Sequence, residues 1–230
     1  IGEPDFDTPP HIIEAAKLAL DSGFTHYNPA PGIPELREAI ASEVSRSRGI
    51  DVRAENVVVV PGGKPIIFYL IQALVDVGDE VITPNPGFPI YQSVIEFVGG
   101  KSVPVQLKEE NDFRLSIDDV AGLLTSKTKL IILNSPQNPT GGVLEKSDLD
   151  ALAELLQNRD VMILSDEIYS RIIYDGFVHD SIASRRGMLE KTIILDGFSK
   201  AYAMTGWRMG YGIMPVWLAK AVAQLAINCN

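Results

Sequence analysis

The chain has 230 residues, of which 46% are hydrophobic, so it can bury a substantial core in one large domain or two small ones. Thirty acidic against twenty basic side chains give a net charge of −10, which argues against a nucleic-acid partner. The single cysteine, Cys229, excludes an intrachain disulfide and fits a reducing compartment, and no apolar run approaches the roughly 20 residues of a membrane span. We therefore expect a cytoplasmic protein with no membrane partner.

The first segments combine prolines with an apolar helix pattern. Residues 1–10 are expected to be extended, and Thr8 is placed to cap a helix that ends near residues 21–23. A proline-rich loop that contains Tyr27 follows, and a second helix begins at Pro34. Taken alone, Tyr27 would be an ordinary packing aromatic.

Strand and helix patterns alternate through the rest of the chain. Strands are predicted at residues 57–60, 81–83, 101–105, 129–133, 161–166, 192–195 and 209–213. Helices are predicted at residues 66–75, 90–98, 116–124, 145–156 and 215–226. This alternation indicates an α/β fold.

Two of the predicted strands lead into segments that could bind a ligand. The turn Gly62-Gly63-Lys64 leads into a helix, whose free N–H groups and positive dipole end favour an anion such as phosphate. Such turns often only permit close packing. Phe88 follows the next strand, where ligands of open α/β sheets collect, and would stack on a planar ring if it is not simply part of the core.

Polar residues also end two strongly apolar strands. A stiff loop over residues 134–141 could aim Asn138 inward, although Asn-Pro-x-Gly is a common turn. Asp166 ends a strand that should be central, where an ionised carboxylate is costly unless a cation meets it. A protonated pyridine nitrogen would be such a cation, and nearby Tyr169 could donate to an oxygen on the same ring. The alternative is a capping or surface aspartate.

Lys200 lies in a segment of small residues that follows another buried strand. A lysine at this position suits a cofactor with a carbonyl group, because its amine becomes a nucleophile once desolvation or a nearby cation lowers its pKa. Arg208 could supply that cation and bind a dianion. On their own, both residues would more often be surface charges.

Together, these motifs resemble the class I/II aminotransferases, the pyridoxal-phosphate enzymes of fold type I, and most closely the aspartate and aromatic aminotransferases. The matching segments, in chain order, are Tyr27, the Gly62-Gly63-Lys64 turn, Asn138-Pro139-Thr140-Gly141, Asp166 with Tyr169, and Lys200 with Arg208. The resemblance implies an α/β/α sandwich around a mostly parallel mixed sheet. Residues 11–230 would form the large, cofactor-binding domain after the extended segment 1–10, and the C-terminal small domain would be absent.

The resemblance also implies a reaction and a set of site residues. The protein would move an amino group between an amino acid, such as aspartate or a related dicarboxylic or aromatic one, and a 2-oxo acid. Catalysis would use pyridoxal 5′-phosphate in a Schiff base with Lys200, assisted by Asp166 and Tyr169. The implied cofactor-binding residues are Gly63, Lys64, Phe88, Asn138, Asp166, Tyr169, Ser199, Lys200, Arg208 and, from the second subunit of a homodimer, Tyr27. The implied substrate-binding residues are Gly2, Lys64 and Asn138.

Other functions share the same motifs. A pyridoxal-phosphate-dependent C–S β-lyase or synthase would use the same contacts to the ring. The aminotransferase-like effector domain of a transcription regulator would also look similar. Such regulators carry an N-terminal helix-turn-helix, which the acidic charge and the first residues here do not show, but the alternative stays open because the sequence can be a truncated piece. A folded but inactive cofactor domain is a third alternative.

Overall fold

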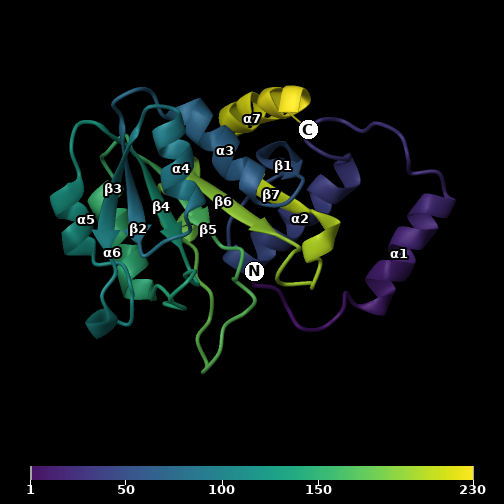
Figure 1. The fold of residues 1–230 in the computed structure, drawn as a ribbon, viewed down its shortest axis with the longest axis horizontal. Coiled ribbons are helices and arrows are strands. Elements are labelled where there is room, and N and C mark those ends of the chain that lie inside the picture. The colour runs from purple at the N-terminus through teal and green to yellow at the C-terminus, as the bar shows by residue number, and fades with distance from the viewer. Residues whose placement is uncertain (1, 230) are drawn as a thin grey trace.

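A seven-stranded mixed sheet forms the centre of the computed structural model, which describes residues 2–229 (Figure 1). The strands are β1 (Val57–Val60), β2 (Glu80–Asn85), β3 (Lys101–Gln106), β4 (Thr128–Asn134), β5 (Met162–Asp166), β6 (Thr192–Gly197) and β7 (Gly210–Ile213). Their order across the sheet is β1-β7-β6-β5-β4-β2-β3. Strand β7 alone runs in the opposite direction to the other strands, and it pairs antiparallel with both β1 and β6. The remaining pairs are parallel, so the mostly parallel mixed sheet is confirmed.

Helices cover both faces of the sheet. The α-helices within residues 2–229 are α1 (Pro10–Asp21), α2 (Pro34–Arg48), α3 (Lys64–Leu74), α4 (Ile90–Phe97), α5 (Ile117–Leu123), α6 (Lys146–Leu156) and α7 (Val216–Cys229). Helices α3, α4 and α7 pack on one face, and α2, α5 and α6 pack on the other (Figure 1). The two helical layers and the sheet make the α/β/α sandwich that the sequence predicts.

The strands with the strongest apolar runs lie side by side at the centre of the sheet. Strand β5 pairs in parallel with β4 and β6, with Asp166 opposite both Asn134 and Leu195. Because the carboxyl ends of parallel strands meet at one edge of a sheet, the segments that follow β4, β5 and β6 emerge together. This arrangement gathers residues that are distant in sequence.

Most predicted elements are present, with boundaries shifted by a few residues. Strand β6 extends beyond its predicted end because Gly197 still pairs with Gly210 of β7. The Ser135–Pro136 and Asn138–Pro139 bonds in the stiff loop after β4 are both cis. No helix within residues 2–229 combines the length and the apolar character that a membrane crossing requires.

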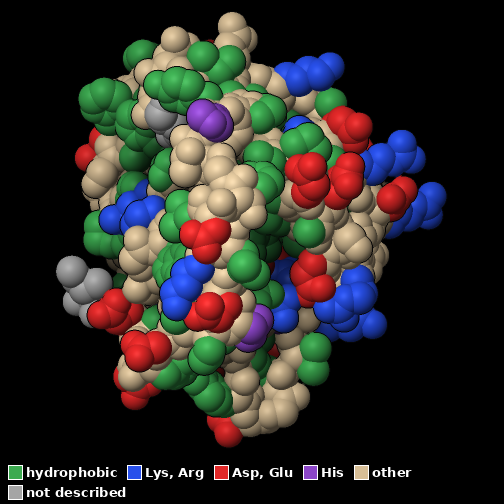
Figure 2. Space-filling model, turned by 90° about the vertical axis from the view of Figure 1, so that its right-hand side faces the viewer, with side chains coloured by type: hydrophobic (Ala, Val, Ile, Leu, Met, Phe, Trp, Pro, Cys, Tyr) green, Lys and Arg blue, Asp and Glu red, His purple; other side chains and the backbone are tan. Residues whose placement is uncertain are grey.

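Helix α1 stands away from the sheet (Figure 1). None of its residues is buried, and its Leu18 and Leu20 side chains are 65% and 62% exposed. Figure 2 views the molecule from the side on which α1 lies, and hydrophobic side chains are spread over that surface. The apolar pattern of residues 10–21 therefore predicted that α1 forms. It did not predict that the apolar side chains of α1 stay exposed in the described chain.

The predicted capping role of Thr8 is wrong. Pro9 is the N-cap of α1 and makes no side-chain capping bond, while Pro10 begins the helix. Proline at the first helical position has no N–H to satisfy, which reduces the need for a cap. The Thr8 hydroxyl instead donates to the carbonyl oxygen of Ala203, at 2.6 Å, in the segment that follows Lys200.

Candidate active site

A cavity of about 650 Å³ lies at the edge of the sheet where β4, β5 and β6 end. The predicted site residues that line it are Gly2, Gly63, Lys64, Phe88, Asn138, Asp166, Tyr169, Ser199, Lys200 and Arg208. Tyr27 does not line this cavity, and its side chain is fully exposed in the single chain. The fold therefore brings together all the predicted residues except the one expected to act from a second subunit.

Asp166 forms a buried acidic end of the cavity, with only 5% of the residue exposed. The Tyr91 hydroxyl donates to its Oδ2 at 2.7 Å, and the Ile168 backbone N–H donates to its Oδ1 at 3.3 Å. Burial raises the pKa of Asp166 to about 6, although the hydrogen bond from Tyr91 opposes the shift. A cation placed beside this carboxylate would stabilise its ionised form.

Two residues that the sequence interpretation missed hold this end of the site. Tyr91 lies in α4 with its ring fully buried and its hydroxyl on Asp166. The Asn134 amide donates to the carbonyl oxygens of Pro136, at 3.2 Å, and Asp166, at 3.1 Å, and its Oδ1 accepts the backbone N–H of Asn138 at 2.8 Å. A polar residue at the end of a buried strand was a usable signal for Asn134, but Tyr91 follows an ordinary apolar helix pattern.

Asn138 and Tyr169 meet at another part of the cavity wall. The Asn138 Nδ2 atom lies 3.5 Å from the Tyr169 hydroxyl oxygen, to which it donates. Burial raises the pKa of Tyr169, and the nearby Asp166 charge adds to the shift, so the phenol stays protonated and can donate. The Lys64 ammonium lies 5.6 Å from the centre of the Phe88 ring, in a cation–π arrangement.

Lys200 places a primary amine in the lining of the cavity. Its Nζ donates to the carbonyl oxygen of Gly2. Partial burial lowers the pKa of Lys200, the Glu3 carboxylate opposes the shift, and the Arg208 guanidinium adds to it. Both causes that the sequence suggested, desolvation and a nearby cation, therefore act on this amine.

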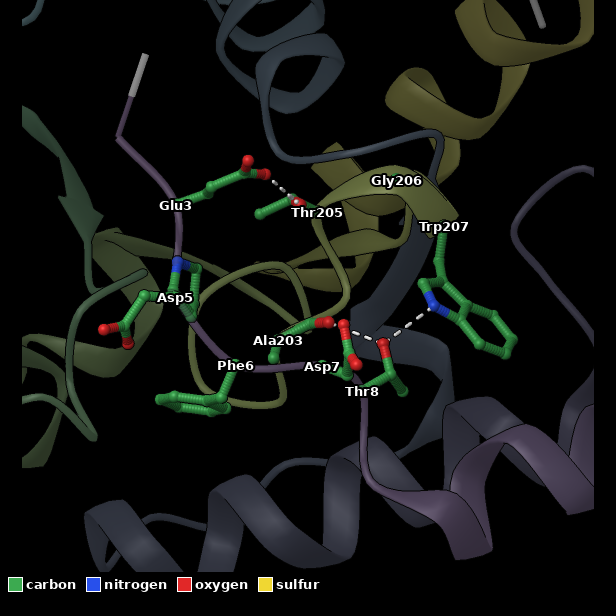
Figure 3. A pocket seen from close by; sticks show the side chains of 10 residues that line it. Glu3, Asp5, Phe6, Asp7, Thr8, Ala203, Thr205, Gly206 and Trp207 are labelled. Atoms are coloured by element: carbon green, nitrogen blue, oxygen red, sulfur yellow. Dashed lines mark hydrogen bonds between the residues drawn. The ribbon is translucent and has the colours of Figure 1, made fainter.

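The N-terminal segment crosses the loop that follows Lys200 (Figure 3). The Thr205 hydroxyl donates to the Glu3 carboxylate at 2.9 Å. The Thr8 hydroxyl, besides its bond to Ala203, accepts the Trp207 indole N–H at 3.0 Å. These bonds hold the segment that carries Gly2 over the lysine.

Arg208 packs against the glycine turn that precedes α3. Its backbone is left-handed, with φ of 54°, and its Nη1 donates to the Thr205 carbonyl oxygen at 2.8 Å. A Cβ atom on Gly62 would lie 2.1 Å from the Arg208 Nη2 atom, so only glycine permits this approach. Gly63 is the N-cap of α3, and the N–H of Lys64 at the first helical position has no acceptor within the helix. Pro65 has no N–H, and the Ile66 N–H donates to the Gly63 carbonyl oxygen at 3.1 Å. The guanidinium and the helix N-terminus together suit a phosphate group.

Similarity to known proteins shows the family of this chain. Residues 1–229 match the family described as aminotransferase class I and II. The chain belongs to this family. Solved aminotransferase structures share its fold.

Relatives in the aminotransferase family are closely similar over most of this chain. An aspartate aminotransferase from Pyrococcus abyssi is 46% identical over 225 residues, which are 97% of this chain and 58% of the relative. Aromatic-amino-acid aminotransferase 2 from Thermococcus litoralis is 47% identical over 226 residues, again 97% of this chain and 58% of the relative. The chain thus spans less than two thirds of the length of these relatives.

Solved structures in the aminotransferase family superpose closely. The aromatic aminotransferase from Pyrococcus horikoshii OT3 has a TM-score of 0.97 and 44% identity, covering 99% of this chain and 61% of that one. The aspartate aminotransferase from Thermus thermophilus with maleate has a TM-score of 0.95 and 44% identity, covering 99% and 59%. These matches confirm the predicted fold, and the chain covers about three fifths of each matched structure.

Replacing Glu3 with glutamine should lower the pKa of Lys200 further. The Glu3 carboxylate favours the charged ammonium, so its removal favours the neutral amine. The reaction rate of this lysine with pyridoxal 5′-phosphate, followed against pH, should then reach half its maximum at a lower pH than in the wild type. Glu14→Gln, which removes an exposed α1 carboxylate that pairs with Lys17, is the matched control and should leave the profile unchanged. A shift to higher pH in Glu3→Gln would contradict this electrostatic interpretation.

Gly62→Ala should weaken binding of the phosphate group. The new Cβ would displace the Arg208 guanidinium and would also strain a backbone with φ of 81°. A displaced guanidinium would lose its hydrogen bonds to the phosphate, worth about 1.5–3 kcal/mol, so we expect at least about a tenfold loss of affinity for pyridoxal 5′-phosphate in a fluorescence titration. Gly23→Ala is the matched control, because Gly23 has φ of 82° and nothing within 4 Å of the added carbon. It should lose stability without losing affinity; an equal loss of affinity in both variants would refute the contact argument.

Proposed function

We propose that the complete protein is an aminotransferase that depends on pyridoxal 5′-phosphate and exchanges an amino group between an amino acid and a 2-oxo acid. The observation that carries the proposal is that a lysine of lowered pKa and a buried aspartate line the same cavity. Membership of the aminotransferase family supports it. We assign residues 11–230 to the cofactor-binding domain.

The cavity has the groups that this cofactor needs. Asp166 offers a buried carboxylate that lacks a cation among its described hydrogen-bond partners, and Lys200 offers a primary amine. Arg208 and the start of α3 suit the phosphate. When bound, pyridoxal 5′-phosphate supplies an aldehyde for the amine and a protonated ring that accepts electrons from the substrate α-carbon.

Lys200 and Asp166 have complementary roles in this proposal. Lys200 would supply the amine that holds the cofactor and, once the substrate amine replaces it, would move a proton from the substrate α-carbon to carbon C4′ of the cofactor. Asp166 keeps a proton on the ring nitrogen through its negative charge, in a site largely shielded from water. Tyr169 and Asn138 donate hydrogen bonds to the ring oxygen.

The remaining predicted residues bind and orient the ligands. Phe88 stacks on the ring. Phosphate contacts come from Arg208, the Gly63 and Lys64 N–H groups and Ser199. We place Gly2 and Asn138 near the substrate carboxylate, and the Lys64 cation near a distal acidic group. Aspartate or a related dicarboxylic or aromatic amino acid is the proposed donor, in line with the names of the relatives.

We propose a homodimer in which Tyr27 completes the neighbouring site. Its side chain is fully exposed, and the adjacent α1 has no buried residue. The hydroxyl of Tyr27 would then donate to the phosphate bound by the other subunit. Dimer formation would bury apolar surface that the single chain leaves exposed on this side (Figure 2).

A panel of amino donors, mixed with the complete protein loaded with cofactor, tests the proposed reaction. Transamination converts the bound cofactor to its amine form, seen in the absorption spectrum, and releases the matching 2-oxo acid. A β-lyase would release pyruvate and ammonia instead, and a regulator domain would bind the donor without turning it over. Either of these outcomes would replace the aminotransferase proposal.

A further inference from the structure

A buried ionic cluster lies on the α2 side of the sheet, outside the lining of the cavity. Arg48, the last residue of α2, donates from Nε to Glu167 Oε2 at 3.0 Å and from Nη2 to Asp196 Oδ2 at 2.7 Å. The three side chains are only 4%, 1% and 6% exposed. Burying such charges is costly even when they are paired, so stability alone is a weak explanation for this cluster.

Further hydrogen bonds fix the Glu167 carboxylate. Its Oε1 accepts from the hydroxyls of Ser165, at 2.9 Å, and Ser181, at 2.6 Å. Its Oε2 shares a hydrogen bond of 2.8 Å with His179 Nε2, in addition to the bond from Arg48. A carboxylate with this many partners has one defined position, so it can act as a rigid anchor.

The cluster joins the two segments that carry the reactive groups. Glu167 directly follows Asp166, and Asp196 precedes the Lys200 loop at the end of β6. The Glu167 N–H donates to the Leu195 carbonyl oxygen at 2.8 Å, where the parallel β5–β6 pairing ends. Side chains alternate between the faces of a sheet, so Asp166 faces the cavity while Glu167 and Asp196 face α2.

We propose that Arg48 is a positioning residue for the reaction: by binding Glu167 and Asp196 together, it sets the spacing between Asp166 and Lys200. Arg48 itself does not line the cavity, so it acts only through these strand ends. The inference rests on the proposed function, since the spacing matters only if both groups meet one cofactor.

The charges of the cluster support this role. Burial raises the pKa of Asp196 to about 6, against the opposing charge of Arg48. Burial also acts to raise the pKa of Glu167, but His179 and Arg48 outweigh it and hold that pKa at about 2. Both carboxylates are therefore ionised at neutral pH. Without the guanidinium the pKa of Asp196 would rise further, so its carboxyl group would take up a proton, and the ionic bridge that joins the two segments would be lost.

Two substitutions in the complete protein separate the charge of Arg48 from its shape. Arg48→Met removes both, whereas Arg48→Lys keeps a charge but replaces a planar fork that contacts two carboxylates with a single ammonium. We expect both variants to weaken binding of pyridoxal 5′-phosphate by about tenfold or more, because small displacements of reacting groups have large effects. We also expect both to shift the pH midpoint of the imine absorption band.

Arg114→Met is the matched control. Arg114 pairs with Glu145 and Asp148 away from the cavity lining, so its loss should lower the melting temperature without changing cofactor affinity or the pH midpoint. If Arg48→Lys and Arg48→Met lowered only the melting temperature, as this control does, the positioning role would be overturned. Wild-type cofactor affinity and pH midpoint in Arg48→Lys would overturn the positioning role as well. A single ammonium charge would then replace the guanidinium that contacts both carboxylates.

A third variant keeps the inference testable if the Arg48 variants do not fold. Glu167→Gln preserves the size of the side chain and an oxygen for the serine hydroxyls but removes the negative charge from the bridge. It should weaken cofactor binding to a similar extent, and wild-type affinity would overturn the proposal. Failure of the unsubstituted protein to form any imine would instead contradict the proposed function and with it this inference.

Discussion

Replacing Lys200 with alanine should abolish the imine absorption band and amino-group transfer together. Alanine has no amine to bond the cofactor and no group to move the substrate α-proton. We expect the rate of 2-oxo acid release to fall by about 10⁴-fold or more, the upper range for loss of general acid–base catalysis. The absorption spectrum of the variant with added pyridoxal 5′-phosphate and a coupled assay of 2-oxo acid release measure the two effects.

Lys64→Ala is the control for this experiment, because Lys64 is the other lysine among the residues that line the cavity. Its ammonium lies 5.6 Å from the centre of the Phe88 ring, in a cation–π arrangement. The imine band should therefore survive in Lys64→Ala. Survival of the band in Lys200→Ala and its loss in Lys64→Ala would reverse the assignment.

Asp166→Asn should bind the cofactor more weakly and lower the rate of transfer by about 10²–10³-fold. Asparagine can still accept the Tyr91 hydrogen bond, but it has no negative charge to keep a proton on the ring nitrogen. Rates of 2-oxo acid release at saturating cofactor measure the catalytic loss apart from the binding loss. A variant with the wild-type rate would show that this carboxylate is not the partner of the ring.

The raised pKa of Asp166 also predicts how cofactor binding depends on pH. Because burial raises that pKa from 3.8 to about 6, the carboxyl group holds a proton below pH 6. An ion pair with the ring requires its release, so the affinity of the wild type should fall as the pH is lowered through 6. Asp166→Asn should lose this component of the pH profile. Tyr91→Phe removes a hydrogen bond that lowers the pKa, so it should move the profile to higher pH.

The sequence predicted the parts of the fold and site that depend on local pattern. Apolar runs located the central strands, and the polar residues after them identified Asp166 and Lys200 at the edge where ligands bind. For the Gly62-Gly63-Lys64 turn, close packing was the alternative to an anion site, and Gly62 does lie against the Arg208 guanidinium.

The sequence did not predict the parts that depend on which elements pack together. Tyr91 and Arg48 lie on helices whose patterns resemble ordinary packing or surface faces, and only the tertiary fold brings them to Asp166 and to Glu167. Thr8 was assigned to the nearest helix by its spacing, but its hydroxyl bonds to the distant lysine loop. Long-range hydrogen bonds of this kind leave no periodic signal in a single sequence.

Borohydride reduction followed by peptide mass spectrometry tests the central claim, that Lys200 holds the cofactor, most directly. The reagent fixes the imine between pyridoxal 5′-phosphate and its lysine as a stable amine, and the mass of each peptide shows where it lies. We predict a single phosphopyridoxyl group, on Lys200. A modification on another lysine, or no modification after cofactor binding, would contradict the account.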